Sequence, residues 1–189
     1  MNKTFIAIIG LIVLIGWAFL YLYPINKEQR DASYISSKYG LSFHYPRNYF
    51  VALEQSFNGE RQQHAIVLAE DTPATQDLFS NPQSATEGPP TITITIFQNN
   101  LDHYTLQSFV EGTNFSNFKL SDGNKTEVIV GGEIAWRYHA TGLYENENIV
   151  VVRPDYVYML TAFFNSPNDQ ILKDFETVLE TMTFTEPIG

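Results

Sequence analysis

One unbroken apolar segment dominates the pattern of hydrophobic and polar positions. Residues 5–23 read FIAIIGLIVLIGWAFLYLY, and nothing comparable follows later in the chain. As an α-helix, these nineteen residues span about 28 Å, close to the thickness of the hydrocarbon core of a bilayer. The segment has no polar face, unlike the surface helix of a soluble protein. It therefore predicts a transmembrane helix.

The alternative to a transmembrane anchor is a cleaved secretory signal. Signal cleavage needs small residues at the end of the apolar run, whereas residues 17–24 read WAFLYLYP. This bulky end favours an uncleaved anchor. The aromatic rings within it also fit a membrane–water interface.

The residues that flank the apolar run set the expected topology. Lys3 precedes the run, and Lys27 and Arg30 follow it, so the positive charges on the two sides nearly balance and leave the inverted orientation as an alternative. A short basic tail before an apolar run is nonetheless typical of an export signal. We expect a cytoplasmic tail over 1–4, a transmembrane anchor over 5–23, a linker over 24–33, and a globular domain over 34–185 outside the cytoplasm, at the cytoplasmic membrane.

Short alternating segments dominate the rest of the chain. The clearest is 91–97, TITITIF, in which isoleucine and threonine alternate with period two. Asn58-Gly59, Gly131-Gly132 and Pro154-Asp155 mark turns between strands. Residues 71–90 are rich in polar residues and proline without periodicity, which predicts a long loop. The pattern predicts strands over 41–45, 49–53, 64–69, 91–97, 127–130, 133–141, 148–153 and 156–164.

Two helices are expected among these strands. A short one begins after Thr105 and ends at Gly112. A long amphipathic one begins with Ser166 as N-cap and Pro167 at the first helical position. The segment 156–164, YVYMLTAFF, is apolar on both faces, as in a central strand covered on both sides. The order of elements predicts an α+β domain with an antiparallel β-sheet and helices on opposite faces.

Charge and cysteine content exclude several classes of protein. The chain has 21 acidic and 11 basic residues, a net charge of −10. We expect no nucleic-acid partner, because phosphate binding requires clusters of Lys and Arg. The absence of cysteine excludes disulfides, thiol catalysis and thiolate metal sites. Acidity fits a cationic partner or a metal ion, while solubility is the simpler explanation.

The histidines do not form a recognisable motif. The chain has four, and none lies at metal-ligand spacing. His44 and His139 lie on the polar sides of predicted strands, where they could approach each other across a sheet. Exposed strand histidines are the simpler interpretation.

Other motifs are equally unspecific. The chain has no GxSxG elbow, and Gly131-Gly132 lacks the spacing of a phosphate-binding loop. Glu70, Asp71 and Asp77 could gather a cation on the 71–90 loop, although charged loop residues are usually only solvated. The sequence predicts no catalytic residue, no cofactor-binding residue and no cofactor, and it leaves a metal site undecided.

Two stretches resemble a known family. Residues 34–46 form an extended Tyr-Gly-x-Ser-Phe-x-Tyr-Pro opening, and the chain closes with an apolar strand, a Ser-Pro break, an amphipathic helix and Met182-Thr183-Phe184. Together they resemble the PsbP-like superfamily, named for an extrinsic subunit of photosystem II and including many bacterial proteins. Tyr49 stands in the region where that family usually carries tryptophan. The resemblance implies an antiparallel sheet sandwiched by helices, and a binding or assembly factor rather than an enzyme.

We therefore expect a membrane-anchored, extracytoplasmic binding or assembly module with a protein partner at the membrane. The surface expected to meet that partner combines the 71–90 loop with the turns around Asn58 and Glu145. The alternatives are a cation-binding domain and an extracytoplasmic hydrolase that uses a histidine–carboxylate pair, with His44 or His139 as the histidine.

Overall fold

The computed structural model describes residues 31–58, 61–81 and 88–188, and the chain divides after Arg30. The predicted tail, the transmembrane run over 5–23 and most of the linker lie outside the described residues. Among the described helices, none is long and apolar enough to cross a membrane.

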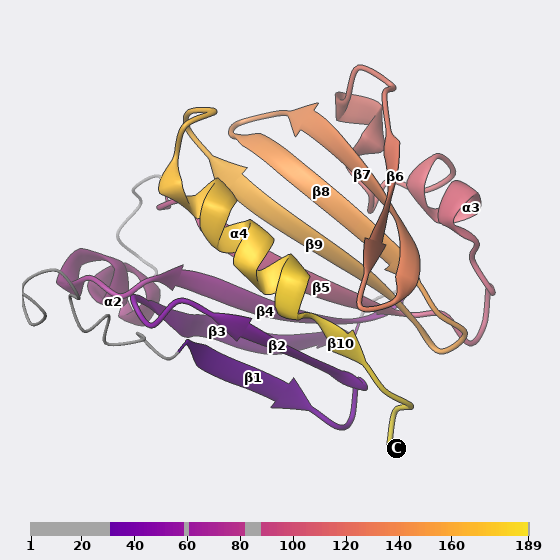
Figure 1. Cartoon of the computed structure of the whole chain (residues 1–189), viewed down its shortest axis with the longest axis horizontal. Helices are drawn as coiled ribbons and strands as arrows, with labels where there is room; N and C mark the ends of the chain where they lie inside the picture. Colours follow the sequence, from indigo (N-terminus) through magenta and orange to yellow (C-terminus); the bar gives the residue numbers. More distant parts are fainter. Residues whose placement is uncertain (1–30, 59–60, 82–87, 189) are drawn as a thin grey trace, which may run out of the picture. The chain divides into compact units, whose positions relative to one another are not determined.

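A seven-stranded antiparallel sheet forms the centre of the domain (Figure 1). Its order is β3-β4-β5-β9-β8-β7-β6, so the chain crosses from β5 to the far edge and returns through a meander that ends beside β5. The strands are β3 (Tyr49–Asn58), β4 (Gln62–Glu70), β5 (Thr91–Gln98), β6 (Thr126–Val130), β7 (Glu133–Thr141), β8 (Glu145–Val152) and β9 (Tyr156–Phe164).

The central position of β9 confirms the strand predicted from its two apolar faces. β9 pairs with β5 on one side and β8 on the other. Tyr158 and Leu160 on one face are buried, and so are Val157 and Met159 on the other. We call these the front and the back face of the large sheet. Because side chains alternate along a strand, burial on both faces requires a cover on each side.

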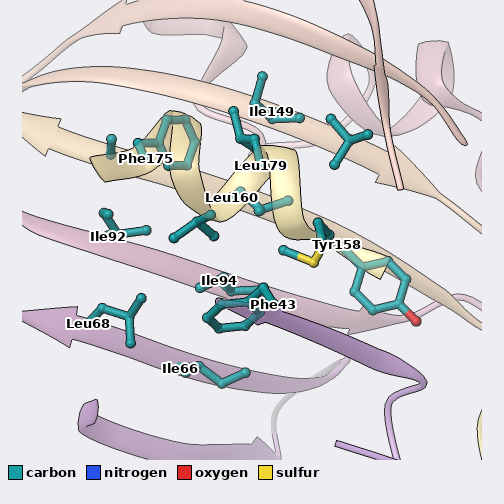
Figure 2. Close-up of a cluster of buried hydrophobic side chains, with 14 of the residues drawn as sticks. Phe43, Ile66, Leu68, Ile92, Ile94, Ile149, Tyr158, Leu160, Phe175 and Leu179 are labelled. Carbon is teal, nitrogen blue, oxygen red and sulfur yellow. The ribbon is translucent and has the colours of Figure 1, made fainter. Parts of the chain in front are cut away.

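The front cover consists of helix α4 (Gln170–Thr181) and a separate three-stranded sheet, which the sequence did not predict. This small sheet has the order β1-β2-β10, from β1 (Ala32–Ser36), β2 (Leu41–Tyr45) and β10 (Thr183–Phe184). Figure 2 shows Phe43 of β2 and Phe175 of α4 among the buried side chains of the large sheet. The two ends of the domain therefore build one layer together.

The back cover is smaller. Helix α3 (Leu106–Val110) and the 3-10 helix η1 (Phe118–Leu120) lie over this face, where Phe109 and Val110 are buried with Val157 and Met159. Thr105 caps α3 in a capping box with Ser108, which confirms the predicted start of this helix. Helices on opposite faces of an antiparallel sheet confirm the expected α+β class.

The predicted loop over 71–90 was partly wrong, because helix α2 (Pro73–Ser80) lies within it. The Thr72 hydroxyl accepts a hydrogen bond from the Thr75 backbone N–H, and Pro73 occupies the first helical position. Its Phe79 ring meets the Phe50 ring of β3 edge-on. A helix of only eight residues is too short to show a continuous apolar stripe in its sequence. The pattern of hydrophobic and polar residues therefore did not indicate a helix here.

The predicted start of α4 was also wrong, by one turn. The N-cap is Asp169 rather than Ser166, because residues 166–169 form a turn in which the Asp169 N–H donates to the Ser166 carbonyl. The Asp169 carboxylate accepts hydrogen bonds from the backbone N–H groups of Asn165 and Ser166. The Asp169 carboxylate therefore binds backbone N–H groups of the turn that precedes the helix.

The turn between β1 and β2 is held by the C-terminal segment. Gly40 has φ +59°, and its carbonyl accepts a hydrogen bond from the Thr185 N–H at 2.8 Å. A Cβ atom at Gly40 would lie 2.3 Å from the Thr185 carbonyl oxygen. Glycine is therefore required here both by the backbone conformation and by this close approach.

Replacing Gly40 by alanine is expected to destabilise the domain more than the same change at Gly123. Both glycines have positive φ, but a Cβ at Gly123 meets no atom within 4 Å. Gly123→Ala should cost about 1 kcal/mol from backbone strain, and Gly40→Ala at least about 1–2 kcal/mol more from the clash. Urea unfolding of both variants measures the difference. Equal losses would contradict the close packing of the C-terminal segment on the β1–β2 turn.

Candidate functional site

Several segments meet at one end of the large sheet, which we call the cleft end. The strand register places Tyr49 opposite Glu70, Ala69 opposite Thr91, and Glu145 opposite Phe164 at this end. At the other end, Asn58 lies opposite Gln62, and Gln98 lies opposite Tyr156. The two ends are separated by the length of strands of eight to ten residues.

A cleft of about 230 Å³ opens at the cleft end. It lies between the start of β3, the end of β4, the start of α2, the segment before β5 and the first turns of α4. Its walls are partly polar and partly apolar, and the side chains that matter below are Tyr49, Glu70, Pro89, Pro90, Gln170 and Asp174. Its size is below that of a typical small-molecule pocket, and it suits a single side chain of a partner.

A fixed carboxylate lies in the wall of this cleft. Asp174 is only 7% exposed, and its carboxylate accepts hydrogen bonds from the Tyr49 hydroxyl at 3.0 Å and from Gln170 Nε2 at 3.1 Å. Burial raises the pKa of Tyr49, and the negative charges of Asp174 and Glu70 raise it further. The tyrosine therefore keeps its proton at neutral pH and remains a donor to Asp174.

The structure brings together two of the three segments expected to form a partner surface. The Tyr144 hydroxyl donates to the Gly88 carbonyl at 2.7 Å, so the turn before Glu145 lies against the 71–90 segment. Leu143 in the same turn is 84% exposed. The third segment lies apart from these two, because β3 continues to Asn58 at the opposite end of the sheet.

The structure does not bring His44 and His139 together, since their strands belong to different sheets. His139 is about half exposed on β7, with Nε2 2.6 Å from Glu145 and Nδ1 3.7 Å from Glu147. His139 and Glu147 line an open surface groove.

His64, which the sequence did not single out, has the most developed surroundings of the four histidines. His64 is 7% exposed, its Nδ1 lies 2.9 Å from Ser56 Oγ, and its Nε2 lies 3.3 Å from Glu54 Oε1. The Tyr34 hydroxyl donates to the same Glu54 oxygen at 2.8 Å. The Tyr39 ring stacks on the imidazole, with 4.4 Å between ring centroids.

The pairing of Ser56 with His64 was missed because the predicted strand ended at Leu53. The hairpin signal at Asn58-Gly59 would not have found it, because a two-residue turn at 58–59 places residue 61 opposite residue 56. The observed register places His64 directly opposite Ser56.

Within the described residues, no group of three or more His, Asp or Glu side chains is arranged to hold a metal ion. This includes the carboxylates of Glu70, Asp71 and Asp77, which the sequence suggested for a cation.

Comparison with known proteins relates the chain to others by fold alone. No family model matches it, and no curated protein matches its sequence. The solution structure of the cyanobacterial PsbP protein CyanoP from Synechocystis sp. PCC 6803 is similar, with 12% sequence identity, a TM-score of 0.50, and coverage of 82% of this chain and 92% of that one. The described domain therefore has a PsbP-like fold.

A crystal structure from Bacteroides thetaiotaomicron VPI-5482 also matches, with 13% identity over 84% of this chain and a TM-score of 0.48. The alignment covers 49% of that protein, so the chain spans about half of its length.

Ionisation of Tyr49 is expected to weaken the fold at alkaline pH. Its pKa is raised in the folded state, so above pH about 10 the unfolded chain releases this proton first, and the free energy of unfolding falls as pH rises. Tyr49→Phe removes this contribution and should make the fall shallower by up to about 1.4 kcal/mol per pH unit. Urea unfolding between about pH 8 and pH 11 measures it.

Asp174→Asn serves as the companion variant, because it removes the nearest charge that raises the Tyr49 pKa. Burial is the largest cause of the raised Tyr49 pKa and persists in this variant, so its slope between about pH 8 and pH 11 should stay close to that of the wild type. The test compares the slopes of the free energy of unfolding against pH, not the absolute stabilities. A general loss of stability in a variant therefore does not affect it. Identical slopes in all three proteins would contradict the buried Tyr49–Asp174 pair.

Proposed function

We propose that this protein is a bacterial, membrane-anchored PsbP-like protein whose domain binds a protein partner outside the cytoplasm. The apolar run over 5–23 supports the anchor, and the PsbP-like fold supports the comparison with binding and assembly factors. In this proposal partner binding uses no cofactor and no catalytic step, and the domain acts by holding a partner at the membrane.

The cleft end is the observation that carries the proposal. Its cleft is wide enough for one side chain, and the buried Asp174 carboxylate in its wall is held by Tyr49 and Gln170. Prolines 89 and 90 and Ile171 supply apolar contact beside that charge. We infer that the partner inserts a basic side chain, with its alkyl part against the apolar wall and its charge toward the carboxylates.

The charge of the domain favours the same class of partner. The described residues include eight basic and 18 acidic side chains, a net charge of −10. Arg61, Arg137 and Arg153 already pair with carboxylates of the domain itself. A basic partner would therefore be attracted over a long range and would dock at a defined end.

Photocrosslinking from the cleft end tests partner binding. A photoreactive amino acid at position 143 should form a crosslink to a membrane-associated protein in intact cells. The control is position 101, because Leu101 is similarly exposed, at 81% against 84%, but follows β5 at the opposite end. Crosslinks of equal yield from both positions, or none from 143, would count against a docking surface at the cleft end.

Thiol labelling tests the proposed topology on a chain that contains no cysteine of its own. A membrane-impermeant maleimide should label Leu143→Cys in intact cells, whereas Asn2→Cys should react only after permeabilisation. The reverse pattern would show the inverted orientation. Recovery of labelled Leu143→Cys in the soluble fraction would show a cleaved signal in place of an anchor.

A further inference from the structure

We propose that Ser56, His64 and Glu54 form a nucleophile, a general base and a positioning carboxylate, and that Ser56 accepts small acyl groups from activated esters. This site lies at the opposite end from the cleft, and the inference does not depend on the proposed binding function.

The backbone positions the serine and the histidine. Ser56 and His64 face each other across the β3–β4 pair, where directly opposed side chains have Cβ atoms about 5 Å apart. Glu54 lies two residues before Ser56 and thus on the same face of β3. Three side chains with the required chemistry therefore lie on one surface of a rigid hairpin, rather than on a loop.

The hydrogen bonds assign the tautomer of His64. An ionised carboxylate only accepts hydrogen bonds, so the proton of the neutral imidazole lies on Nε2, toward Glu54 Oε1. Nδ1 then carries the lone pair, and the Ser56 hydroxyl donates to it at 2.9 Å. This is the arrangement of a serine whose proton a histidine removes, with a carboxylate that holds the imidazole in place.

The surroundings fix the base and leave the nucleophile accessible. The Tyr39 ring stacks on His64, and the Tyr34 hydroxyl holds Glu54. Ser56 is exposed, while His64 is buried beside it. The base therefore cannot turn away, and an ester can approach Ser56 from solvent.

A cavity beside Ser56 limits the size of the acyl group. It has a volume of about 40 Å³ and is lined by Ser56, His64, Tyr39 and Lys38 among others. This space holds a few water molecules or a group such as acetyl, while a larger leaving group would remain in solvent. Lys38, whose ammonium lies 4.9 Å from the centroid of the Tyr39 ring, supplies a positive charge in the cavity lining for the developing oxyanion.

The reaction needs no component beyond an ester and water. Ser56 Oγ forms a bond to the acyl carbon, its proton passes to His64 Nδ1, and the carbonyl electron pair moves to the oxygen. Collapse of this intermediate expels the alkoxide, which takes the proton from Nδ1 and leaves as the alcohol. A leaving group that stays ionised, such as p-nitrophenolate, leaves that proton on Nδ1, which loses it to solvent. Water, deprotonated by the same nitrogen, then releases the acid and restores Ser56.

A second serine–histidine pair in the domain provides a matched control. Ser33 and His44 also lie directly opposite each other, on β1 and β2. Within the described part of the chain, their side chains form no hydrogen bond with each other, and His44 is exposed. Ser33 should therefore have the ordinary reactivity of a surface serine.

The full-length protein in detergent is treated with a fluorophosphonate and with p-nitrophenyl acetate, and adducts are located by tandem mass spectrometry. We expect both reagents to modify Ser56 and not Ser33. Ser56→Ala should abolish the adduct, His64→Gln should lower the rate at least about 100-fold, and Glu54→Gln at least about tenfold. Ser33→Ala and His44→Gln should leave the rate unchanged.

Two further measurements separate catalysis from structure. Thermal melts show whether each variant is folded; if His64→Gln is not, Glu54→Gln, whose side chain is half exposed, decides in its place. Nitrogen NMR of the His64 ring should show the Nε2–H tautomer in the wild type and a mixture in Glu54→Gln. The proposal is overturned if folded wild-type protein gives no Ser56 adduct, if Ser33 reacts equally, or if loss of His64 or of the Glu54 charge leaves the rate unchanged.

Discussion

The need to cover both faces of β9 determines most of this structure. β9 lies between β5 and β8, and its apolar side chains alternate between two hydrophobic clusters, with Leu160 in the front one and Met159 in the back one. A central strand of this composition exposes about half of its apolar surface unless each face is covered. The crossing from β5 to β6 carries α3 and η1 to the back, and the chain after β9 turns directly into α4 at the front.

The front cover comes from both ends of the domain, and this creates its openings. β1 and β2 precede the large sheet in the sequence, while α4 and β10 follow it, and hydrogen bonds such as that from Thr185 to Gly40 join them into one layer. Figure 1 shows this layer, from indigo and yellow segments, lying across the large sheet. The cleft with Asp174 opens at one end of the seam between the layers, and the cavity with His64 opens at the other.

The sequence predicted the parts of this fold that local pattern determines. The alternation in 91–97 and the doubly apolar 156–164 gave β5 and β9 almost residue for residue, because burial on a pleated strand directly sets that pattern. The second half of β3 was missed, because it is exposed at the edge of the sheet. Glu54-Gln55-Ser56 therefore shows no alternation of apolar and polar residues. The pairing of β1 and β2 with β10 rather than with the large sheet depends on contacts between distant segments, which no local pattern records.

The same distinction explains why the candidate sites were only partly predicted. Asp174 shows no local sign of burial in the sequence, and its buried carboxylate accepts a hydrogen bond from Tyr49, 125 residues away. The Ser56–His64 pair depends on the register of a hairpin. Because the two openings lie at opposite ends of one seam and share no lining residue, a change at one should not alter the other. A membrane anchor would raise the local concentration of any partner in the same membrane, so weak contacts at the cleft would suffice for binding there.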